Sequence, residues 1–498
     1  MSASKTVIPI TPLPPREPPG APRPPANDRI HARAVSGRYA TRRWLMVWLT
    51  QAVFYGLPWL DWGGRPAMLF DLDARRFYLP GVVLQPQDMV WLAALLVLCA
   101  LGLFFVTAVA GRVWCGYSCP QTVYTEIFMW IEQRIEGSRG ARIRLDRDGV
   151  NARWLALKGA KHAAWIAFSL WTGFTLVGYF TPIRELAGAV LTLSTGPWES
   201  FWLLFYGLAT YGNAGFLREQ VCKHMCPYGR FQGAMLDPDS LVISYDAARG
   251  EPRGALPKGV PATARAGLAG ASAAPPTKTA PAAAPAHGAC IDCSLCVQVC
   301  PTGIDIRDGL QTLCIGCAAC IDACDSVMDK LGAPRGLVRY TTENALALGL
   351  DRAATLRRLL RPRVLIYGAL LVALSAAFVL SLAGRHSLRV DVIRDRGVMA
   401  RAVEDGASEN VYRLVLMNSA EQSRRVRIDV TGAPGLHIEE SEPVTIEPAS
   451  DRSVPLHVRL DAGAGVGPAG ATLPIMFEVH ALDGDEPVVR EPSTFILP

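Results

Sequence analysis

Two scarcities, of charged residues and of cysteine outside the middle of the sequence, limit the classes of protein to which this chain can belong. Only 19% of its 498 residues are charged, whereas about a quarter of the residues in soluble globular domains are charged. None of its 13 cysteines lies before Cys99 or after Cys324, which excludes a secreted disulfide scaffold, because such chains are short and carry cysteine throughout. The shortage of charge in a chain that is half hydrophobic therefore indicates a membrane protein, and the clustered cysteines indicate metal rather than disulfides.

Several familiar catalytic motifs are also absent. The sequence has no P-loop, no G-x-G-x-x-G after a strand, no Ser/His/Asp arrangement and no H-E-x-x-H. An enzyme built from this chain must therefore receive its electrons from a separate donor. We expect no signal peptide, since the first apolar run begins at Trp44 and lacks a small-residue cleavage site. The net charge of +6 follows from basic segments near the membrane, so no nucleic-acid partner is expected.

Five apolar runs approach the length of about 20 residues that a membrane-spanning helix needs. These runs are Trp44–Leu60, Met89–Ala110, Leu155–Phe180, Glu199–Phe216 and Val364–Ala383. The first run is short and contains Gln51 and Pro58, and the fourth has a weak start. Buried core helices are the alternative, but five such runs are difficult to place in a soluble fold.

The distribution of Lys and Arg predicts the orientation of these helices. Residues before the first run and residues 112–158 are rich in basic side chains, whereas the loop between the third and fourth runs holds only Arg184. This pattern predicts a cytoplasmic amino terminus, a cytoplasmic segment 218–363 and an exported segment after Arg385. Every clustered cysteine then lies on the reducing side of the membrane, and the exported segment has none.

Composition divides the chain into six segments. We expect a disordered basic arm (1–43), a four-helix membrane region (44–246), an Ala/Pro-rich linker (247–288), a ferredoxin domain (289–345), a fifth membrane helix (364–384) and a β-sandwich (386–498). The linker is predicted to be extended and to tether the next domain loosely. The β-sandwich is predicted from short alternating runs separated by turn residues, and it carries no cluster of catalytic residue types.

The strongest motif is C-I-D-C-S-L-C-V-Q-V-C-P at 290–301, which is repeated as C-I-G-C-A-A-C-I-D-A-C-D at 314–325. In bacterial ferredoxins three thiolates of such a run bind one 4Fe-4S cluster, and the fourth binds the other cluster. The predicted ligands are Cys290, Cys293, Cys296 and Cys324 for one cluster, and Cys300, Cys314, Cys317 and Cys320 for the second. Structural zinc is the alternative, but a zinc site does not require two interlocking runs.

A second repeat follows two of the apolar runs. Cys115 and Cys119 lie in C-G-Y-S-C-P, and Cys222 and Cys226 lie in C-K-H-M-C-P. Because both motifs emerge on the predicted cytoplasmic face, their thiols can converge, and we predict that these four cysteines are the catalytic residues.

Three occupants suit four converged thiols: a third iron–sulfur cluster, a dithiol–disulfide pair, or Cu(I), for which His224 and Met225 are further compatible ligands. The alternative is that both motifs are helix ends followed by a proline that begins the next helix. The remaining cysteine, Cys99, lies inside the second apolar run, where it is expected to be a packing residue.

With these motifs, the chain resembles the CcoG/FixG/RdxA family of accessory proteins of the cbb-type cytochrome oxidase. The resemblance includes the run from Cys290 to G-L-V-R-Y at 336–340, W-C-G-Y-S-C-P-Q-T-V-Y from Trp114, F-D-L-D-A-R-R-F-Y at 70–78, V-G-Y-F-T-P-I at 177–183 and E-N-V-Y-R-L at 409–414. It implies a multi-pass polyferredoxin of the bacterial inner membrane with a periplasmic immunoglobulin-like domain. It also implies reduction of Cu(II) to Cu(I) on the cytoplasmic side during oxidase assembly.

The fold class expected is thus a multidomain membrane protein with about five transmembrane α-helices, a cytoplasmic two-cluster ferredoxin domain and a C-terminal immunoglobulin-like β-sandwich. The leading function is a cupric reductase-like oxidoreductase whose partners are membrane lipid, oxidase assembly factors or a copper transporter or chaperone. A dimer is compatible with the sequence, and the electron donor is not identified by it. The alternatives are a quinol-oxidising electron-transfer subunit of a membrane reductase complex and a non-enzymatic oxidase assembly scaffold.

Overall fold

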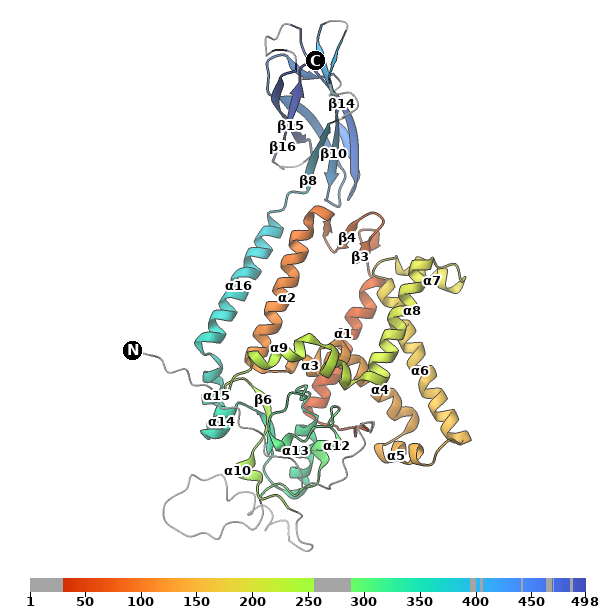
Figure 1. The fold of residues 1–498 in the computed structure, drawn as a ribbon, viewed down its shortest axis with the longest axis vertical. Helices are drawn as coiled ribbons and strands as arrows, with labels where there is room; N and C mark the ends of the chain where they lie inside the picture. Colours follow the sequence, from red (N-terminus) through yellow and green to blue (C-terminus); the bar gives the residue numbers. More distant parts are fainter. Residues whose placement is uncertain are drawn as a thin grey trace, which may run out of the picture.

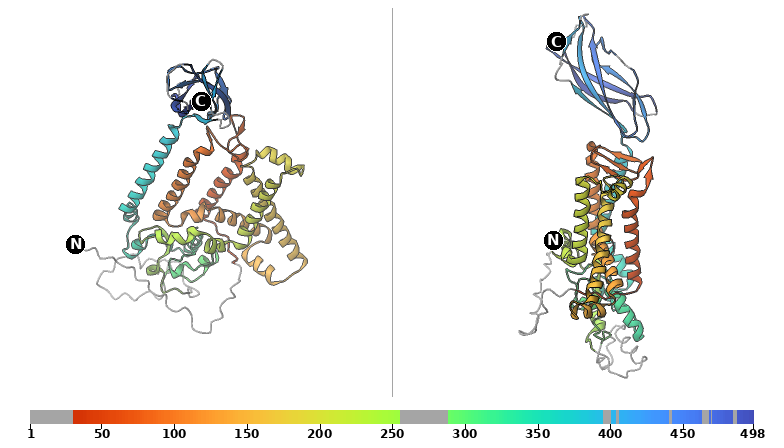
Figure 2. Two further views of the ribbon diagram at one scale, coloured as in Figure 1. Left: turned by 45° about the horizontal axis from the view of Figure 1, so that its top comes forward. Right: turned by 90° about the vertical axis from the view of Figure 1, so that its right-hand side faces the viewer.

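The computed structural model describes residues 30–254, 288–394, 400–403, 406–439, 442–462, 468, 470–483 and 487–498. Figures 1 and 2 show an elongated molecule in which a layer of helices separates a cysteine-rich domain from a β-sandwich. The expected disorder of residues 1–29 and the expected mobility of residues 255–287 fall outside the described residues.

Helices occupy the positions of all five apolar runs. They are α1 (Arg38–Gly56), α2 (Met89–Ala110), α6 (Ala152–Val177), α8 (Pro197–Gly212) and α16 (Pro362–Ala383). Within the described residues, two helical segments are long and apolar enough to cross a membrane, Pro86–Ala110 and Pro362–Ala383. The count of five spans is therefore not confirmed, because α8 has only 16 residues and α1 begins with a basic turn.

Helices α2 and α16 expose large apolar side chains on their outer faces. Val90 on α2 is 76% exposed and Leu380 on α16 is 72% exposed. Contiguous apolar surface of this kind is unfavourable in water and marks a face that contacts lipid or another protein. Cys99 also lies exposed on α2, so the prediction that it packs in the protein interior is wrong.

Short elements connect the long helices. Five short strands, β1 (Asp61–Trp62), β2 (Arg65–Pro66), β3 (Leu69–Asp71), β4 (Arg76–Leu79) and β5 (Val82–Leu84), join α1 to α2 on the side of the sandwich. On the side of the cysteine-rich domain lie α3 (Val113–Tyr117), α4 (Pro120–Glu136), α5 (Arg139–Arg147), η4 (Val221–Met225) and α9 (Pro227–Met235). The turn η3 (Asn213–Leu217) extends α8, and α7 (Ile183–Leu191) joins α6 to α8.

The cysteine-rich domain comprises residues 242–254 and 288–341, so it begins before the expected linker. Strand β6 (Val242–Tyr245) pairs antiparallel with β7 (Val338–Thr341). Between them lie α10 (Ala247–Gly250), α12 (Leu295–Gln298), η5 (Ile306–Asp308) and α13 (Ala319–Leu331). The Ala289 N–H donates to the Arg249 carbonyl at 2.9 Å, which ties residues on either side of 255–287 together. The prediction that residues 247–288 form a linker preceding this domain is therefore wrong for 247–254 and 288, which belong to the domain, and the predicted extended tether at 255–287 lies outside the described residues.

The described part of the expected arm 1–43 is also ordered. Residues 38–43 form the first turns of α1, which therefore starts six residues before Trp44. The Arg33 N–H donates to the Gln298 carbonyl of the cysteine-rich domain at 2.8 Å. Beyond this domain, α14 (Glu343–Ala347) and α15 (Arg352–Leu359) lead into α16.

The carboxyl-terminal residues form the predicted immunoglobulin-like sandwich of two antiparallel sheets. One sheet has the order β12-β14-β10-β8 with β9 beside β10, and the other has the order β13-β11-β15-β16. Their bounds are β8 (Leu388–Arg394), β9 (Arg401–Ala402), β10 (Ser408–Asn418), β11 (Arg424–Thr431), β12 (Leu436–Ile438), β13 (Val444–Ile446), β14 (Asp451–Leu460), β15 (Thr472–Ala481) and β16 (Val489–Ile496). Alternate residues face the core, where Tyr412, Phe477 and Phe495 are fully buried.

Candidate metal centres

The structure gathers the eight ferredoxin-type cysteines around two cavities. One cavity is lined by Cys290, Cys293, Cys296 and Cys324. The other is lined by Cys300, Cys314, Cys317 and Cys320, with Cys296 at its border. The last cysteine of each run thus lies with the first three cysteines of the other run, which is the ligand exchange typical of two-cluster ferredoxins.

The walls of both cavities are otherwise mainly apolar. Ile304 and Ile306 line the second cavity, and Val327 and Met328 line the first. Four cysteine sulfurs in an apolar pocket are the donor set that holds a 4Fe-4S cluster, so these residues fit such a cofactor. When bound, each cluster supplies a one-electron redox centre.

The backbone of the two cysteine runs repeats the same unusual conformation. Asp292 and Ser294 in the first run have φ of 52° and 55°, and Gly316 and Ala318 at the matching positions of the second run have φ of 69° and 60°. The left-handed conformation costs a residue other than glycine about 1 kcal/mol. These turns curl each C-x2-C-x2-C segment around its cavity, so local strain is used to aim the thiols.

Spacing of the thiols argues against zinc. Four ligands of a tetrahedral zinc site lie about 3.8 Å apart, given Zn–S bonds of about 2.3 Å. Within the described residues, one group of three or more Cys, His or carboxylate ligand atoms lies within 4.8 Å of one another, and it is Glu409, Glu439 and His457 of the sandwich. The cysteine sets are more widely spaced, as a polynuclear cluster requires.

Burial controls the ionisation of these thiols. It raises the pKa of Cys317 and of Cys324 to about 12, and that of Cys296 to about 11. A thiol must lose its proton to bind iron. Loading of the cavities is therefore coupled to proton release and to the positive charge that iron supplies.

The two C-x3-C-P motifs adopt matching positions at helix starts. Cys119 is the N-cap residue of α4 and Cys226 is the N-cap residue of α9, each followed by a proline at the first helical position. Their partners Cys115 and Cys222 lie on α3 and η4. The predicted helix-end geometry is therefore present at both motifs.

The four thiols of these motifs lie close enough to influence one another's ionisation. The pKa of Cys115 is raised to about 12, first by burial and then by Cys119, Cys222 and Cys226. Burial raises the pKa of Cys222 to about 11, with smaller contributions from Cys119, Cys226 and Glu219. The structure thus brings together the four cysteines that were predicted to converge, whereas His224 and Met225 are exposed, with Met225 61% accessible.

The first C-x3-C-P motif lies directly against the second cysteine run. A Cβ added to Gly116 would lie 2.7 Å from the carbonyl oxygen of Gly316 and 2.9 Å from Cα of Cys317. A Cβ added to Gly316 would lie 3.0 Å from the carbonyl oxygen of Arg112. Glycine at both positions allows this approach, which sets Cys115 beside the predicted cluster ligand Cys317.

Arg112 joins three of the cysteine-bearing loops. Its guanidinium donates to the carbonyl oxygens of Thr312, just before Cys314, and of Gly229, just after the second C-x3-C-P motif. Sequence reasoning missed Gly116, Gly316 and Arg112. A glycine inside both C-G-Y-S-C-P and C-I-G-C was the available signal, because it permits close backbone contact.

Helix α1 is fixed to the cysteine-rich domain at its amino terminus. The carboxylate of Asp322 accepts hydrogen bonds from the N–H groups of Tyr39 and Ala40 at 3.2 and 2.7 Å. Gly37 is required here, since a Cβ would lie 2.4 Å from Cγ of Asp322. Asp322 thus caps a helix that begins more than 280 residues earlier in the chain.

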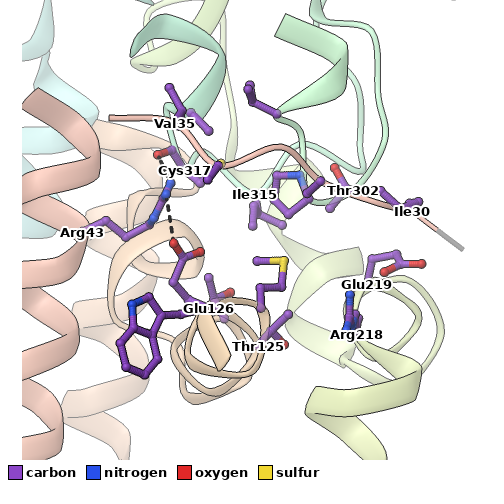
Figure 3. A pocket seen from close by; sticks show the side chains of 18 of the residues that line it. Ile30, Val35, Arg43, Thr125, Glu126, Arg218, Glu219, Thr302, Ile315 and Cys317 are labelled. Carbon is purple, nitrogen blue, oxygen red and sulfur yellow. Dashed lines mark hydrogen bonds and ion pairs between the residues drawn. The ribbon is translucent and has the colours of Figure 1, made fainter. Parts of the chain in front are cut away.

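One turn further along α1, Arg43 connects the cysteine-rich domain to α4 (Figure 3). Its Nη1 donates to the Cys317 carbonyl at 3.2 Å, and its Nη2 donates to Oε1 of Glu126 at 3.1 Å. Because Arg43 is buried, its hydrogen bond to the Cys317 carbonyl places a fixed positive charge next to a predicted cluster ligand. No pattern in the residues around Arg43 indicates this contact.

Comparison with known families assigns these segments. Residues 217–343 match the 4Fe-4S dicluster domain, residues 92–138 match a 4Fe-4S binding domain, and residues 378–498 match the Ig-like fold at the C-terminus of FixG. The chain thus contains iron–sulfur binding domains at both groups of cysteines, with the first C-x3-C-P motif inside one of them.

Three curated relatives match over most of the chain. The chain is 35% identical to protein RdxA of Cereibacter sphaeroides over 96% of its length and 98% of the relative's. It is 37% identical to protein RdxB of the same organism, covering 89% of the chain and 91% of RdxB. It is 36% identical to the nitrogen fixation protein FixG of Rhizobium meliloti, covering 86% of each. With this identity and coverage, and with two membrane-length helices, the chain belongs to the FixG/RdxA family of membrane iron–sulfur proteins.

Proposed function

We propose that this protein passes electrons from its cysteine-rich domain to Cu(II) bound at the four C-x3-C-P thiols, and so reduces it to Cu(I) during cytochrome oxidase assembly. The observation that carries the proposal is the backbone contact between Gly116 and Gly316, which sets one C-x3-C-P motif against the Cys314–Cys317 loop. Reduction of Cu(II) needs one electron, and an iron–sulfur centre supplies electrons singly. Copper is the substrate in this reaction, and the chain's own residues provide the route and the binding groups.

The chemistry of the thiols supports copper as the acceptor. Thiolates prefer Cu(I) to Cu(II), so a site made of Cys115, Cys119, Cys222 and Cys226 favours the reduced ion. The guanidinium of Arg112 lowers the pKa of Cys115 and of Cys222 against the larger effect of burial. Its positive charge therefore assists thiolate formation at the site, and the Cu(I) formed is available to a copper transporter, a copper chaperone or an oxidase assembly factor.

The proposed orientation places the cysteine-rich domain in the cytoplasm and the sandwich in the periplasm of the inner membrane. Helices α1, α2, α6, α8 and α16 then serve as five spans. The basic side chains of α5, including Arg142 and Arg144, lie at the end of the helices that faces the cysteine-rich domain, whereas Arg184 lies on α7 at the other end. This asymmetry agrees with the positive-inside rule.

The decisive experiment replaces Cys222 and Cys226 by alanine together. The protein is reduced with dithionite, freed of the reductant and mixed with Cu(II) under anaerobic conditions. We expect copper reduction to be abolished while the paramagnetic signals of the two ferredoxin clusters remain. Cys99→Ala, which removes an exposed cysteine on α2, is the matched control and should reduce copper normally. Unchanged copper reduction in the double variant would exclude this mechanism.

The metal and sulfide content of the protein identifies the group that the four C-x3-C-P cysteines bind. No three of their sulfurs in the described chain lie within 4.8 Å of one another, so we propose that one pair among them, rather than all four, binds the copper ion. A single pair such as Cys115 and Cys119 remains able to hold Cu(I). The iron, sulfide and copper content of anaerobically purified protein separates two clusters with copper from three clusters without it.

A further inference from the structure

A cavity of about 200 Å³ lies where the amino-terminal segment, α4 and the cysteine-rich domain meet (Figure 3). We call it the interface cavity. Its wall includes Cys317, a predicted cluster ligand, and Cys222 of the second C-x3-C-P motif. Neither cluster binding nor the C-x3-C-P chemistry accounts for this space, and a single metal ion does not need it.

The lining of the interface cavity combines apolar walls with a few buried polar groups. Trp44, Met129, Trp130, Val35 and Ile315 provide the apolar surface. The polar groups are Gln121, Thr125, Gln133 and the ion pair of Arg43 with Glu126. The side chains of that pair are only 8% and 16% exposed. Apolar walls with a few fixed polar groups are typical of sites for small organic ligands.

The charges around the interface cavity disfavour a strongly anionic ligand. Arg43 is paired with Glu126, and both Arg142 and Arg218 are paired with Glu132. The carboxylates of Glu126 and Glu132 on α4 thus offset two of these three guanidinium charges, and Arg33 and Glu219, which also line the cavity, add one charge of each sign. A neutral molecule with polar groups on an apolar ring suits this lining better than a phosphate or a carboxylate does.

The interface cavity also lies beside surface that suits lipid. Trp44 and Trp130 pack edge to face with their ring centroids 6.3 Å apart, and tryptophan is enriched at membrane–water interfaces. The next residues of α1 expose Leu45 and Trp48, which are 65% and 69% accessible. A lipid-soluble molecule that moves along α1 therefore reaches the cavity without crossing water.

We propose that the interface cavity binds the head group of a membrane hydroquinone, which is the electron donor to the cysteine-rich domain. Oxidation of one hydroquinone to its quinone releases two electrons and two protons. The clusters that the eight ferredoxin-type cysteines would hold would take up one electron each, and the carboxylates of Glu126 and Glu219 pass the two protons to water. The later transfer of these electrons to copper rests on the proposed function. The binding and oxidation of the hydroquinone do not.

Arg43 is the residue that couples the two sides of this site. Its guanidinium contacts the Glu126 carboxylate inside the cavity and the Cys317 carbonyl of the cysteine-rich domain. A fixed positive charge beside a cluster ligand favours the reduced cluster, which is the state produced by electron entry. Arg43 therefore acts as a positioning residue between the donor and its acceptor.

The test uses the purified, cluster-loaded protein in detergent and the naphthoquinone pair menadione and menadiol as probes. Thr125→Phe fills the cavity from α4, and Thr192→Phe places the same side chain at the exposed C-cap residue of α7 as the control. We expect Thr125→Phe to lose saturable menadione binding in equilibrium dialysis. We also expect it to slow menadiol-driven bleaching of the cluster absorbance by about tenfold or more, while Thr192→Phe behaves as the wild type.

A second variant guards against misfolding of the first. Glu126→Gln keeps the shape of the cavity but removes a proton acceptor, so menadione binding should persist while cluster reduction slows. Glu185→Gln, an exposed change on α7, is its control. Equal menadiol-driven reduction in wild type, Thr125→Phe and Glu126→Gln would overturn the proposal, as would unchanged menadione binding in Thr125→Phe.

Measurement of Cu(II) reduction distinguishes a failure of this proposal from a failure of the proposed function. Thr125→Phe reduced with dithionite and freed of the reductant should still reduce Cu(II) at the wild-type rate. If wild-type protein accepts electrons from menadiol but fails to reduce Cu(II), the proposed function falls and the donor site stands. If Thr125→Phe bound menadione normally while still reducing Cu(II), the donor site would fall and the proposed function would stand.

Discussion

The β-sandwich and the junction between the cysteine-rich domain and the helices differ in how far apart in sequence their contacting residues lie. The sandwich is built from one stretch of sequence, and its buried residues, including Tyr412 and Phe477, contact one another. The junction between the cysteine-rich domain and the helices is built from segments far apart in sequence, as in the bond from Ala40 to Asp322. We therefore expect the sandwich to tolerate substitution without disturbing the cysteine-rich domain, whereas in the proposed function the contacts at the junction hold the electron route together. Four substitutions test this contrast.

The largest effect is expected from Gly116→Ala. The added Cβ would lie 2.7 Å from the Gly316 carbonyl oxygen, and backbone cannot give way as a side chain can. The two loops must separate, and displacement of reacting groups by about 1 Å costs about a hundredfold in rate. Copper reduction by pre-reduced protein measures this. Gly140→Ala on α5 meets no atom within 4 Å and is the control. Wild-type copper reduction in Gly116→Ala would show that this contact is not the electron route.

Phe477→Ala tests the opposite end. Phe477 is fully buried and its ring centroid lies 5.1 Å from that of Tyr412. Removal of such a side chain costs about 3–5 kcal/mol of stability. Calorimetry should show the sandwich unfolding at lower temperature, while cluster content and copper reduction stay at wild-type values below that transition. Loss of clusters in this variant would contradict the independence of the two ends.

Asp322→Ala removes the cap that joins α1 to α13. Loss of an N-cap costs about 0.5–2 kcal/mol, and here the loss falls on the contact between two domains. Hydrogen exchange should accelerate at the N–H groups of Tyr39 and Ala40. Asp351→Ala is the control, since Asp351 caps α15 within its own segment by accepting from the Ala354 N–H at 2.8 Å. Slow exchange at Tyr39 in Asp322→Ala would show that α1 is held by other contacts.

The smallest effect is expected from Glu409→Gln in the sandwich. Burial opposes ionisation of Glu409, but hydrogen bonds from His457, Arg459 and Arg401 outweigh it and lower the pKa to about 2. A carboxylate with a lowered pKa stabilises the fold above its unfolded pKa, and this contribution is lost as the pH falls toward 2. The partners are partly exposed, so we expect a loss of less than about 1 kcal/mol at neutral pH. In thermal unfolding, the difference from wild type should close in acid; a difference that persists there would contradict the assignment.

Sequence reasoning succeeded where the pattern is local. The spacing of the cysteine runs determines which thiols can face one cavity, and alternation of apolar residues determines the faces of the sandwich strands. Sequence reasoning failed where a contact joins two segments that are far apart in the sequence and carry no distinctive pattern. The basic turn from Arg38 to Arg43 resembles a solvated arm, because the carboxylates of Asp322 and Glu126 that receive it are distant in sequence. The four-residue strand β6 carried too little pattern to show that the cysteine-rich domain starts before the Ala/Pro stretch.

The cap on α1 also imposes an order on how the protein is made. Tyr39 is synthesised 283 residues before the Asp322 that receives its N–H, so the first helix of the nascent chain begins with unsatisfied donors and several arginines. Its first turn is completed only after α13, which carries Cys320 and Cys324, has folded. Acquisition of iron and completion of the first helix are thereby linked in time. A chain starved of iron is expected to display an uncapped basic amino terminus, which is the kind of frayed segment that proteases cleave first.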